Sequence, residues 1–197
     1  MSSASDGAPD TPPQILECGD GRTIAYHQLA GKSPGVMFLT GFKSDMTGGK
    51  ALALEAHCRA QGRAFLRFDY TGHGQSSGVF EEGSIGAWAA DAMTALDELA
   101  VGDHVLVGSS MGGWIMLLTA LARKSRIRGL LGLAAAPDFT EDSMWAGFSE
   151  AQKTTLAAEG QVALPSEYGA PYIITRRLIE EGRNNLVLRS PLDLPFP

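Results

Sequence analysis

The residues from Gly108 to Gly112 read Gly-Ser-Ser-Met-Gly and match the pattern G-x-S-x-G, with Ser110 at its centre. The pattern lies between an apolar, strand-like run at residues 103–108 and a helix-like segment at residues 111–124. In that context the serine stands on a sharp strand-to-helix turn that exposes its hydroxyl as a nucleophile. Residues two before and two after such a serine crowd each other unless they lack a Cβ. The spacing therefore predicts Ser110 as a catalytic nucleophile, and the alternative is a glycine-rich turn whose serine only caps the helix.

Two backbone N–H groups are predicted to stabilise the oxyanion that forms when this serine attacks a carbonyl carbon. Met111 follows Ser110 at the amino end of the predicted helix, where free N–H groups and the helix dipole favour negative charge. The second donor in such sites comes from the loop after an earlier strand. Gly41 and Phe42 follow the apolar run at residues 35–40, so the Phe42 N–H is the predicted second donor. The alternative for Phe42 is an apolar loop residue that takes no part in the reaction.

Three segments of the chain resemble the α/β-hydrolase superfamily. They are residues 40–48 (TGFKSDMTG), 69–78 (DYTGHGQSSG) and 108–114 (GSSMGGW). The first of them, together with residues 165–172 (PSEYGAPY), resembles a narrower group. That group comprises the abhydrolase-domain palmitoyl-protein thioesterases of mitochondria and their bacterial relatives, and it includes acyl-glucuronide esterases. The resemblance implies an α/β-hydrolase fold, in which helices cover both faces of a mostly parallel sheet and a helical lid follows the sixth strand.

The second of these segments contains Asp69 and His73. The resemblance implies that His73 is structural and braces the loop beside the site. Asp69 ends a predicted strand, and we expect its carboxylate to accept hydrogen bonds from N–H groups of that loop.

A serine nucleophile needs a base that takes its proton and an acid that orients the base. In this fold the chain order is serine, then aspartate or glutamate, then histidine. The histidines are His27, His57, His73 and His104, and all of them precede Ser110. The triad histidine that the resemblance implies is therefore absent from this chain.

The triad acid is also expected to be absent, because the family places it after a further strand that would begin near residue 195. Asp138 follows the predicted strand at residues 127–135, a position that some lipases of the superfamily use for the acid. The alternative for Asp138 is a turn or helix-capping aspartate before the lid, and Asp193 is interpreted as a solvated tail residue. Without further strand–helix units, residues 127–135 would form an exposed apolar edge. We therefore expect a chain truncated at its carboxyl end; the alternatives are a site completed by a partner chain and a pseudoenzyme.

Strand-like and helix-like segments alternate along the chain, which predicts an α/β fold with a mostly parallel sheet. The predicted strands are residues 14–17, 22–28, 35–40, 63–70, 103–108 and 127–135, and the predicted helices are residues 46–61, 84–100 and 111–124. Residues 141–159 and 171–181 are predicted to be helical with no buried strand between them, so a lid is expected over about residues 138–182. The hydrolase domain, predicted to be incomplete, covers residues 14–197, after a disordered lead-in at residues 1–13.

The composition excludes several classes of protein. The chain has 197 residues, 44% of them hydrophobic, and a formal net charge of −6, which excludes the basic surface of a nucleic-acid-binding protein. No apolar stretch is long enough to span a membrane. Residues 1–14 lack the features of a signal or transit peptide, so a cytoplasmic location is predicted. Cys18 and Cys58 have neither disulfide nor metal-site spacing, and no metal or cofactor is predicted.

The predicted function is hydrolysis of a small acyl ester or thioester through an acyl-enzyme on Ser110. Apolar lid residues could line an acyl pocket or could simply pack against the core; they are Trp145, Phe148, Leu156, Leu164, Tyr168 and Tyr172. The alternatives are a non-catalytic binding protein on a hydrolase scaffold and another reaction that uses the same triad. The oligomeric state, the acyl group and the preference for ester or thioester are left open.

Overall fold

A six-stranded sheet forms the centre of the protein in a computed structural model that describes residues 11–165 and 171–196. The strand order is β1-β2-β4-β3-β5-β6. The strands are β1 (Gln14–Glu17), β2 (Thr23–Leu29), β3 (Lys32–Leu39), β4 (Arg63–Phe68), β5 (His104–Ser109) and β6 (Ile127–Leu133). Strands β4, β3, β5 and β6 are parallel to one another, whereas β2 is antiparallel to both of its neighbours. The predicted lead-in at residues 1–13 lies mostly outside the described residues.

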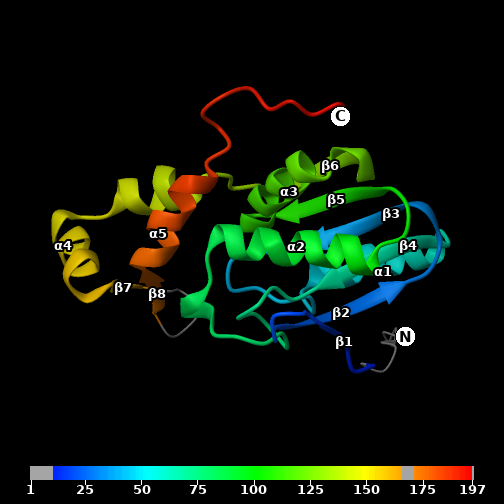
Figure 1. The fold of residues 1–197 in the computed structure, drawn as a ribbon, viewed down its shortest axis with the longest axis horizontal. Coiled ribbons are helices and arrows are strands. Elements are labelled where there is room, and N and C mark those ends of the chain that lie inside the picture. The colour runs from blue at the N-terminus through cyan, green and yellow to red at the C-terminus, as the bar shows by residue number, and fades with distance from the viewer. Residues whose placement is uncertain (1–10, 166–170, 197) are drawn as a thin grey trace, which may run out of the picture.

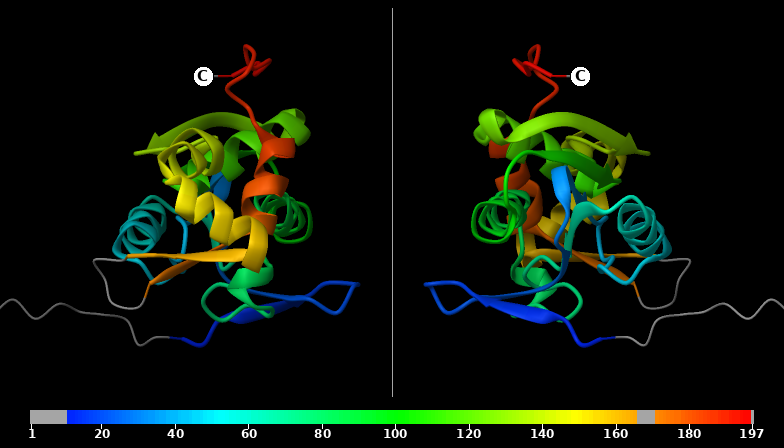
Figure 2. Two further views of the ribbon diagram at one scale, coloured as in Figure 1. Left: turned by 90° about the vertical axis from the view of Figure 1, so that its left-hand side faces the viewer. Right: turned by 90° about the vertical axis from the view of Figure 1, so that its right-hand side faces the viewer.

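Helices cover both faces of this sheet, as the sequence predicted. The helices are α1 (Gly49–Ala60), α2 (Ile85–Leu99) and α3 (Met111–Ala122). Figure 2 shows α1 and α2 on opposite sides of the molecule. Cys58 of α1 packs with Phe38 and Phe65 on one face, whereas Trp88 of α2 packs with Met37 in the larger cluster on the other face. Strands buried on both faces explain why the central sequence runs are apolar throughout instead of alternating.

The region after β6 contains strands that the sequence analysis did not predict. The elements of this region are a π-helical segment (Thr140–Trp145), α4 (Glu150–Glu159), β7 (Gln161–Leu164), β8 (Tyr172–Thr175) and α5 (Arg176–Gly182). The prediction of helices alone was wrong, because β7 and β8 pair as an antiparallel ribbon. Strand β8 is rich in aromatic and β-branched residues, which favour strands, but it is too short for a periodicity to be read from the sequence.

Strand β8 and helix α5 belong to a lobe beyond the carboxyl ends of the parallel strands (Figure 1). Two contacts fix α5 and the turn after it to the sheet domain. The Glu181 carboxylate accepts hydrogen bonds from the Gly86 N–H at 3.0 and 3.1 Å, in the first turn of α2. The Trp114 indole N–H of α3 donates to the Asn185 carbonyl at 2.9 Å. An acidic group at a helix amino end is stabilised by the helix dipole, so the first contact is electrostatically favourable.

Strand β6 pairs on one side only within the described residues. Its Leu131 side chain is 50% exposed. The structure therefore has the apolar strand edge that the sequence analysis expected at residues 127–135.

The longest described helix, α2, has 15 residues, and none of the described helices has the length and apolar character that a membrane span requires.

The imidazole of His104, the first residue of β5, makes the stability of the fold depend on pH. The imidazole is buried, with Nδ1 3.2 Å from the Gly102 carbonyl oxygen and Nε2 directly above Gly35 of β3. Burial lowers the pKa of His104 from its ordinary value of 6.5. The unfolded chain therefore binds a proton near that pH while the folded chain does not, so acidification destabilises the fold.

We predict that the free energy of unfolding falls between pH 7.5 and pH 5.5, and that His104→Gln makes this fall smaller. The exposed His57 of α1 supplies the matched control His57→Gln, which should keep the wild-type pH dependence. Urea titrations at both pH values measure the effect. An unchanged pH dependence in His104→Gln would show that this histidine does not titrate as its burial implies.

Candidate active site

Ser110 occupies a strained turn between β5 and α3. Its φ of 53° and ψ of −121° lie where residues other than glycine are rare, which costs about 1–3 kcal/mol. Hydrogen bonds hold the turn on both sides. The Ser110 N–H donates to the Leu133 carbonyl at 3.1 Å, and the Ser110 carbonyl accepts from the N–H groups of Gly113 at 2.8 Å and Ala136 at 3.0 Å. The serine side chain is exposed, whereas Ser109 before it is buried.

The glycines around Ser110 are required by backbone contacts. A Cβ on Gly108 would overlap the backbone of Gly112, and a Cβ on Gly112 would overlap the carbonyl oxygen of Leu39. These contacts confirm the crowding that the G-x-S-x-G spacing predicted. Gly113, which the sequence analysis did not single out, is equally constrained, because a Cβ there would overlap the Ala135 side chain.

Both predicted oxyanion donors belong to segments that contact the nucleophile turn. Met111 is the first residue of α3, so its N–H lies at the amino end of that helix. The loop after β3 passes directly beside the serine, since a Cβ on Gly41 would lie 3.4 Å from the Ser110 Cβ. Phe42 follows within a turn that is closed by a hydrogen bond from the Ser44 N–H to the Gly41 carbonyl at 3.1 Å.

The Phe42 side chain is the centre of an aromatic cluster. Its ring centroid lies 4.9 Å from that of Phe80, 5.7 Å from Phe139, and 6.2 Å from both Trp88 and Tyr172. All four pairs meet edge to face, which is a favourable geometry for aromatic rings. Phe139 and Tyr172 come from the region after β6, so this cluster joins that region to the loop that carries Phe42.

The sequence analysis missed Phe80 and Phe139, because no local pattern brings these rings to Phe42.

Of the apolar residues that the sequence analysis proposed for a lid pocket, those that the structure describes, other than Tyr172, are not among the rings paired with Phe42. Phe148 and Leu156 are buried in the core, and Leu164 packs against it. Trp145 lies between the cationic groups of Lys153 and Arg183, with distances of 5.3 and 4.7 Å to its ring centroid. Tyr168 and most of residues 165–172 lie outside the described residues.

Asp69 and His73 brace the loops beside the site. The buried Asp69 carboxylate accepts hydrogen bonds from the N–H groups of Met46 at 2.7 Å and Gln75 at 2.9 Å, so it joins the loop after β3 to the loop after β4. This confirms the role expected for Asp69. The His73 ring is buried edge to face against Trp88, and Nδ1 faces the Thr71 carbonyl at 3.3 Å; within the part of the chain that the structure describes, Nε2 has no hydrogen-bond partner. Burial also lowers the pKa of His73, which fits a neutral, structural ring.

The other histidines lie away from the nucleophile turn. His104 begins β5 and Ser110 follows its end, so the two residues stand at opposite ends of one strand. His57 lies on the exposed surface of α1. His27 belongs to β2, which β4 and β3 separate from β5. The structure therefore brings none of these three histidines to Ser110.

Asp138 ties the beginning of the region after β6 to its end. Its fully buried carboxylate accepts hydrogen bonds from the N–H groups of Val187 at 2.8 Å and Leu188 at 2.9 Å, and the Arg189 guanidinium lies 3.6 Å away. Both oxygens are thus engaged in holding two distant segments together. Asp193, by contrast, is exposed and pairs with Lys124 at 2.6 Å, a hydrogen bond that lowers the pKa of Asp193.

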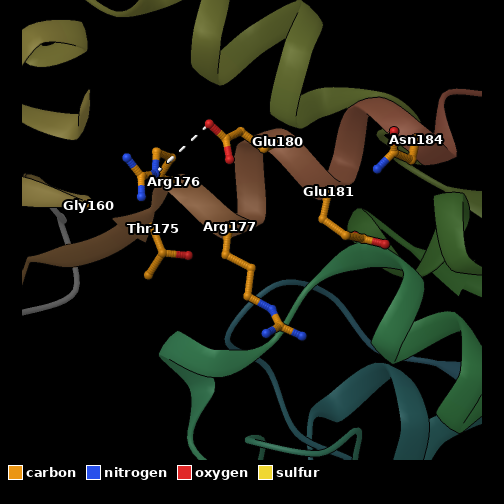
Figure 3. Close-up of a pocket in the computed structure, with 7 residues that line it drawn as sticks. All are labelled: Gly160, Thr175, Arg176, Arg177, Glu180, Glu181 and Asn184. Atoms are coloured by element: carbon orange, nitrogen blue, oxygen red, sulfur yellow. Dashed lines mark ion pairs between the residues drawn. The ribbon is translucent and has the colours of Figure 1, made fainter.

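Of two hollows on the surface, one lies on α5 and the other lies next to the turn that carries Ser110. One hollow, of about 570 Å³, is an open and charged surface on α5, lined by Arg176, Arg177, Glu180 and Glu181 among others (Figure 3). A smaller hollow of about 90 Å³ lies between Gly41, Ser109 and the start of α1, next to the nucleophile turn. Among the described residues, no group of three or more His, Cys, Asp or Glu side chains could hold a metal ion.

Comparison with known proteins identifies the family. Residues 40–191 match the model of the Alpha/beta hydrolase family. This chain belongs to the α/β-hydrolase family. Among solved structures, the alpha/beta hydrolase domain-containing protein 10 from mouse is 36% identical with a TM-score of 0.86, covering 95% of this chain and 75% of that one. A hydrolase from Agrobacterium vitis S4 is also 36% identical, with a TM-score of 0.88 and coverages of 95% and 77%.

Curated relatives give the same family. The chain is 40% identical over 177 residues to "Palmitoyl-protein thioesterase ABHD10, mitochondrial" of Rattus norvegicus. The aligned region covers 89% of this chain and 59% of that relative. The Homo sapiens protein of the same name is 39% identical over 176 residues, covering 88% of this chain and 57% of the relative. The chain therefore spans less than two thirds of the length of these curated relatives.

These matches overturn the predicted cytoplasmic location. The relatives from rat and human are both named as mitochondrial proteins. The prediction was wrong because it rested on features that residues 1–14 lack, and the composition of a short segment does not determine a compartment.

We predict that Gly112→Ala destabilises the protein by about 1–3 kcal/mol or more, because the new methyl group forces the start of α3 away from β3. The control is Gly147→Ala, since a Cβ at Gly147 meets nothing within 4 Å and the change should stay within about 0.5 kcal/mol. Thermal and urea unfolding of both variants test this. Equal stabilities of the two variants would contradict the crowding described above.

Asp138→Asn is expected to weaken the tie between residue 138 and the segment at residues 187–188. The amide NH₂ replaces one acceptor oxygen and faces an N–H donor, which costs about 1–3 kcal/mol in a buried site. The control Asp142→Asn alters an exposed partner of Arg189 and should have little effect. Urea unfolding and limited proteolysis of residues 139–186 measure the difference. The tie would be refuted by proteolysis rates in Asp138→Asn that match those of the control.

Proposed function

We propose that this chain carries the nucleophile and the oxyanion donors of a serine hydrolase that cleaves carboxylic ester or thioester bonds. The observation that supports this most strongly is the Ser110 turn, in which an exposed serine is held at a strained φ by hydrogen bonds on both sides. Strain of this kind persists at functional sites when the surrounding structure over-determines it. Membership of the α/β-hydrolase family supports the same role.

In this proposal the Ser110 Oγ loses its proton and attacks the acyl carbonyl carbon; the C–O or C–S bond of the substrate then breaks, the alcohol or thiol leaves with a proton, and the acyl group stays on Ser110 as an acyl-enzyme. The negative charge that develops on the carbonyl oxygen is stabilised by the N–H groups of Met111 and Phe42. Donors of this type are already oriented before the reaction, and the loss of one typically costs about 10²–10³ in kcat. Water then attacks the acyl-enzyme and releases the carboxylic acid.

The substrate class follows from the relatives. The rat and human relatives are named palmitoyl-protein thioesterases, so we propose that this chain acts on an acyl-protein thioester or a carboxylic ester. The aromatic cluster around Phe42, with Phe139 and Tyr172 from the proposed lid at about residues 138–182, supplies an apolar surface that suits an acyl group.

Proton transfer needs groups beyond those assigned here. No histidine follows Ser110 in these 197 residues, and the buried ring of His73 faces the Thr71 carbonyl with its Nδ1. The proposal therefore assigns the base and the acid to groups outside the 197 residues. The alternative, a non-catalytic binding protein on a hydrolase scaffold, is favoured by the same observation, so the experiment must separate the two.

We predict that a fluorophosphonate probe labels the natural polypeptide at Ser110, because an activated serine displaces fluoride from phosphorus. Mass spectrometry of the tryptic fragment at residues 68–123 locates the adduct. Ser110→Ala should abolish the labelling, whereas Ser125→Ala, which removes a serine at the far end of α3, should leave it unchanged.

Two results would contradict the proposal. Labelling that persists in Ser110→Ala would mean that the nucleophile is another residue. A natural polypeptide that is folded but unlabelled would favour the non-catalytic alternative.

A further inference from the structure

Tyr172 contacts the loop that carries the proposed oxyanion donor. It is the first residue of β8, and its ring centroid lies 6.2 Å from that of Phe42 with an interplanar angle of 75°. The same tyrosine ring lies 5.6 Å from the Lys43 ammonium nitrogen. One side chain from the region after β6 thus touches two consecutive residues of the loop after β3.

That loop has a strained backbone. Lys43 has a φ of 54°, in the left-handed region that favours glycine. A non-glycine residue in such a conformation persists only where surrounding contacts hold it. The contacts of the Lys43 ammonium are Glu81 at 3.9 Å, the Phe80 ring at 4.6 Å and the Tyr172 ring. The loop conformation therefore depends on side chains from other elements.

The direction of the Phe42 N–H is set by the backbone on either side of it. On one side, Gly41 lies beside Ser110, where an added Cβ would come to 3.4 Å from the Ser110 Cβ. On the other side, the strained Lys43 is held by the contacts just described. Loss of the Tyr172 ring would remove one contact from Phe42 and one from Lys43 together, which allows the turn to relax and the N–H to move.

We infer that Tyr172 is a positioning residue that keeps the Phe42 N–H directed toward the oxyanion. This inference rests on the proposed function, because it requires the Phe42 N–H to be an oxyanion donor. An interaction made in the transition state alone changes the maximal rate and not the binding of the ground state. A residue that only lines the acyl pocket would change binding instead, so the two roles give different kinetics.

The test is the rate of phosphonylation of the natural polypeptide by a fluorophosphonate at increasing probe concentrations. For Tyr172→Ala we expect the maximal rate to fall about tenfold or more, since small displacements of reacting groups have effects of this size. With a fluorophosphonate that carries only a methyl group in place of a long chain, the half-saturating concentration should change less than twofold, because such a probe does not use the apolar surface to which Tyr172 contributes. Tyr172→Phe keeps the ring and should restore the wild-type rate, and Ile173→Ala, on the opposite face of β8, should leave it unchanged.

The outcomes separate this inference from the proposed function. A wild-type protein that is not labelled at Ser110 would overturn the proposed function. A labelled wild type with an unchanged maximal rate in Tyr172→Ala, or with only a raised half-saturating concentration, would overturn the role of Tyr172 alone. If Tyr172→Ala does not fold, Tyr172→Leu decides, because it keeps apolar volume without the ring; a wild-type maximal rate in that variant would overturn the inference.

Discussion

The close approach of the first turn of α3 to the end of β3 is the constraint on which the site depends. Gly112 lies against the Leu39 carbonyl so closely that no side chain fits between them. This contact forces the chain to leave β5 through a sharp turn, and Ser110 takes up the resulting strain. The same approach brings Gly41 beside the serine. The close contact between Gly112 and Leu39 thus brings together Ser110, the amino end of α3 and the loop after β3.

Polar and aromatic contacts hold the region after β6 against the sheet domain. Asp138 binds the backbone of residues 187–188, and Glu181 binds the first turn of α2. Phe139, next to Asp138, and Tyr172 of β8 pack on Phe42. The hydrogen bonds of Asp138 attach the region after β6 to the rest of the chain. The rings of Phe139 and Tyr172 contact Phe42, so the position of this region affects the loop beside Ser110. If Ser110 and Phe42 act as proposed, the region after β6 is therefore part of the catalytic geometry.

The sequence predicted the parts of this structure that local patterns encode. Continuous apolar runs marked the central strands, and the spacing of Gly108, Ser110 and Gly112 marked the turn between β5 and α3. The β7–β8 ribbon was missed because strands of four residues show no readable period. The ring contacts of Phe42 and the engagement of Asp138 join segments far apart in the chain. Such contacts depend on how the elements pack, and no local pattern specifies them.

The most direct test of the account is a crystal structure of the natural polypeptide with a phosphonate bound covalently to Ser110. The phosphoryl oxygen of such an adduct occupies the place of the oxyanion. The account predicts that this oxygen lies about 2.7–3.1 Å from the backbone nitrogens of both Phe42 and Met111. An adduct whose phosphoryl oxygen faces solvent, or is bound by other donors, would contradict it.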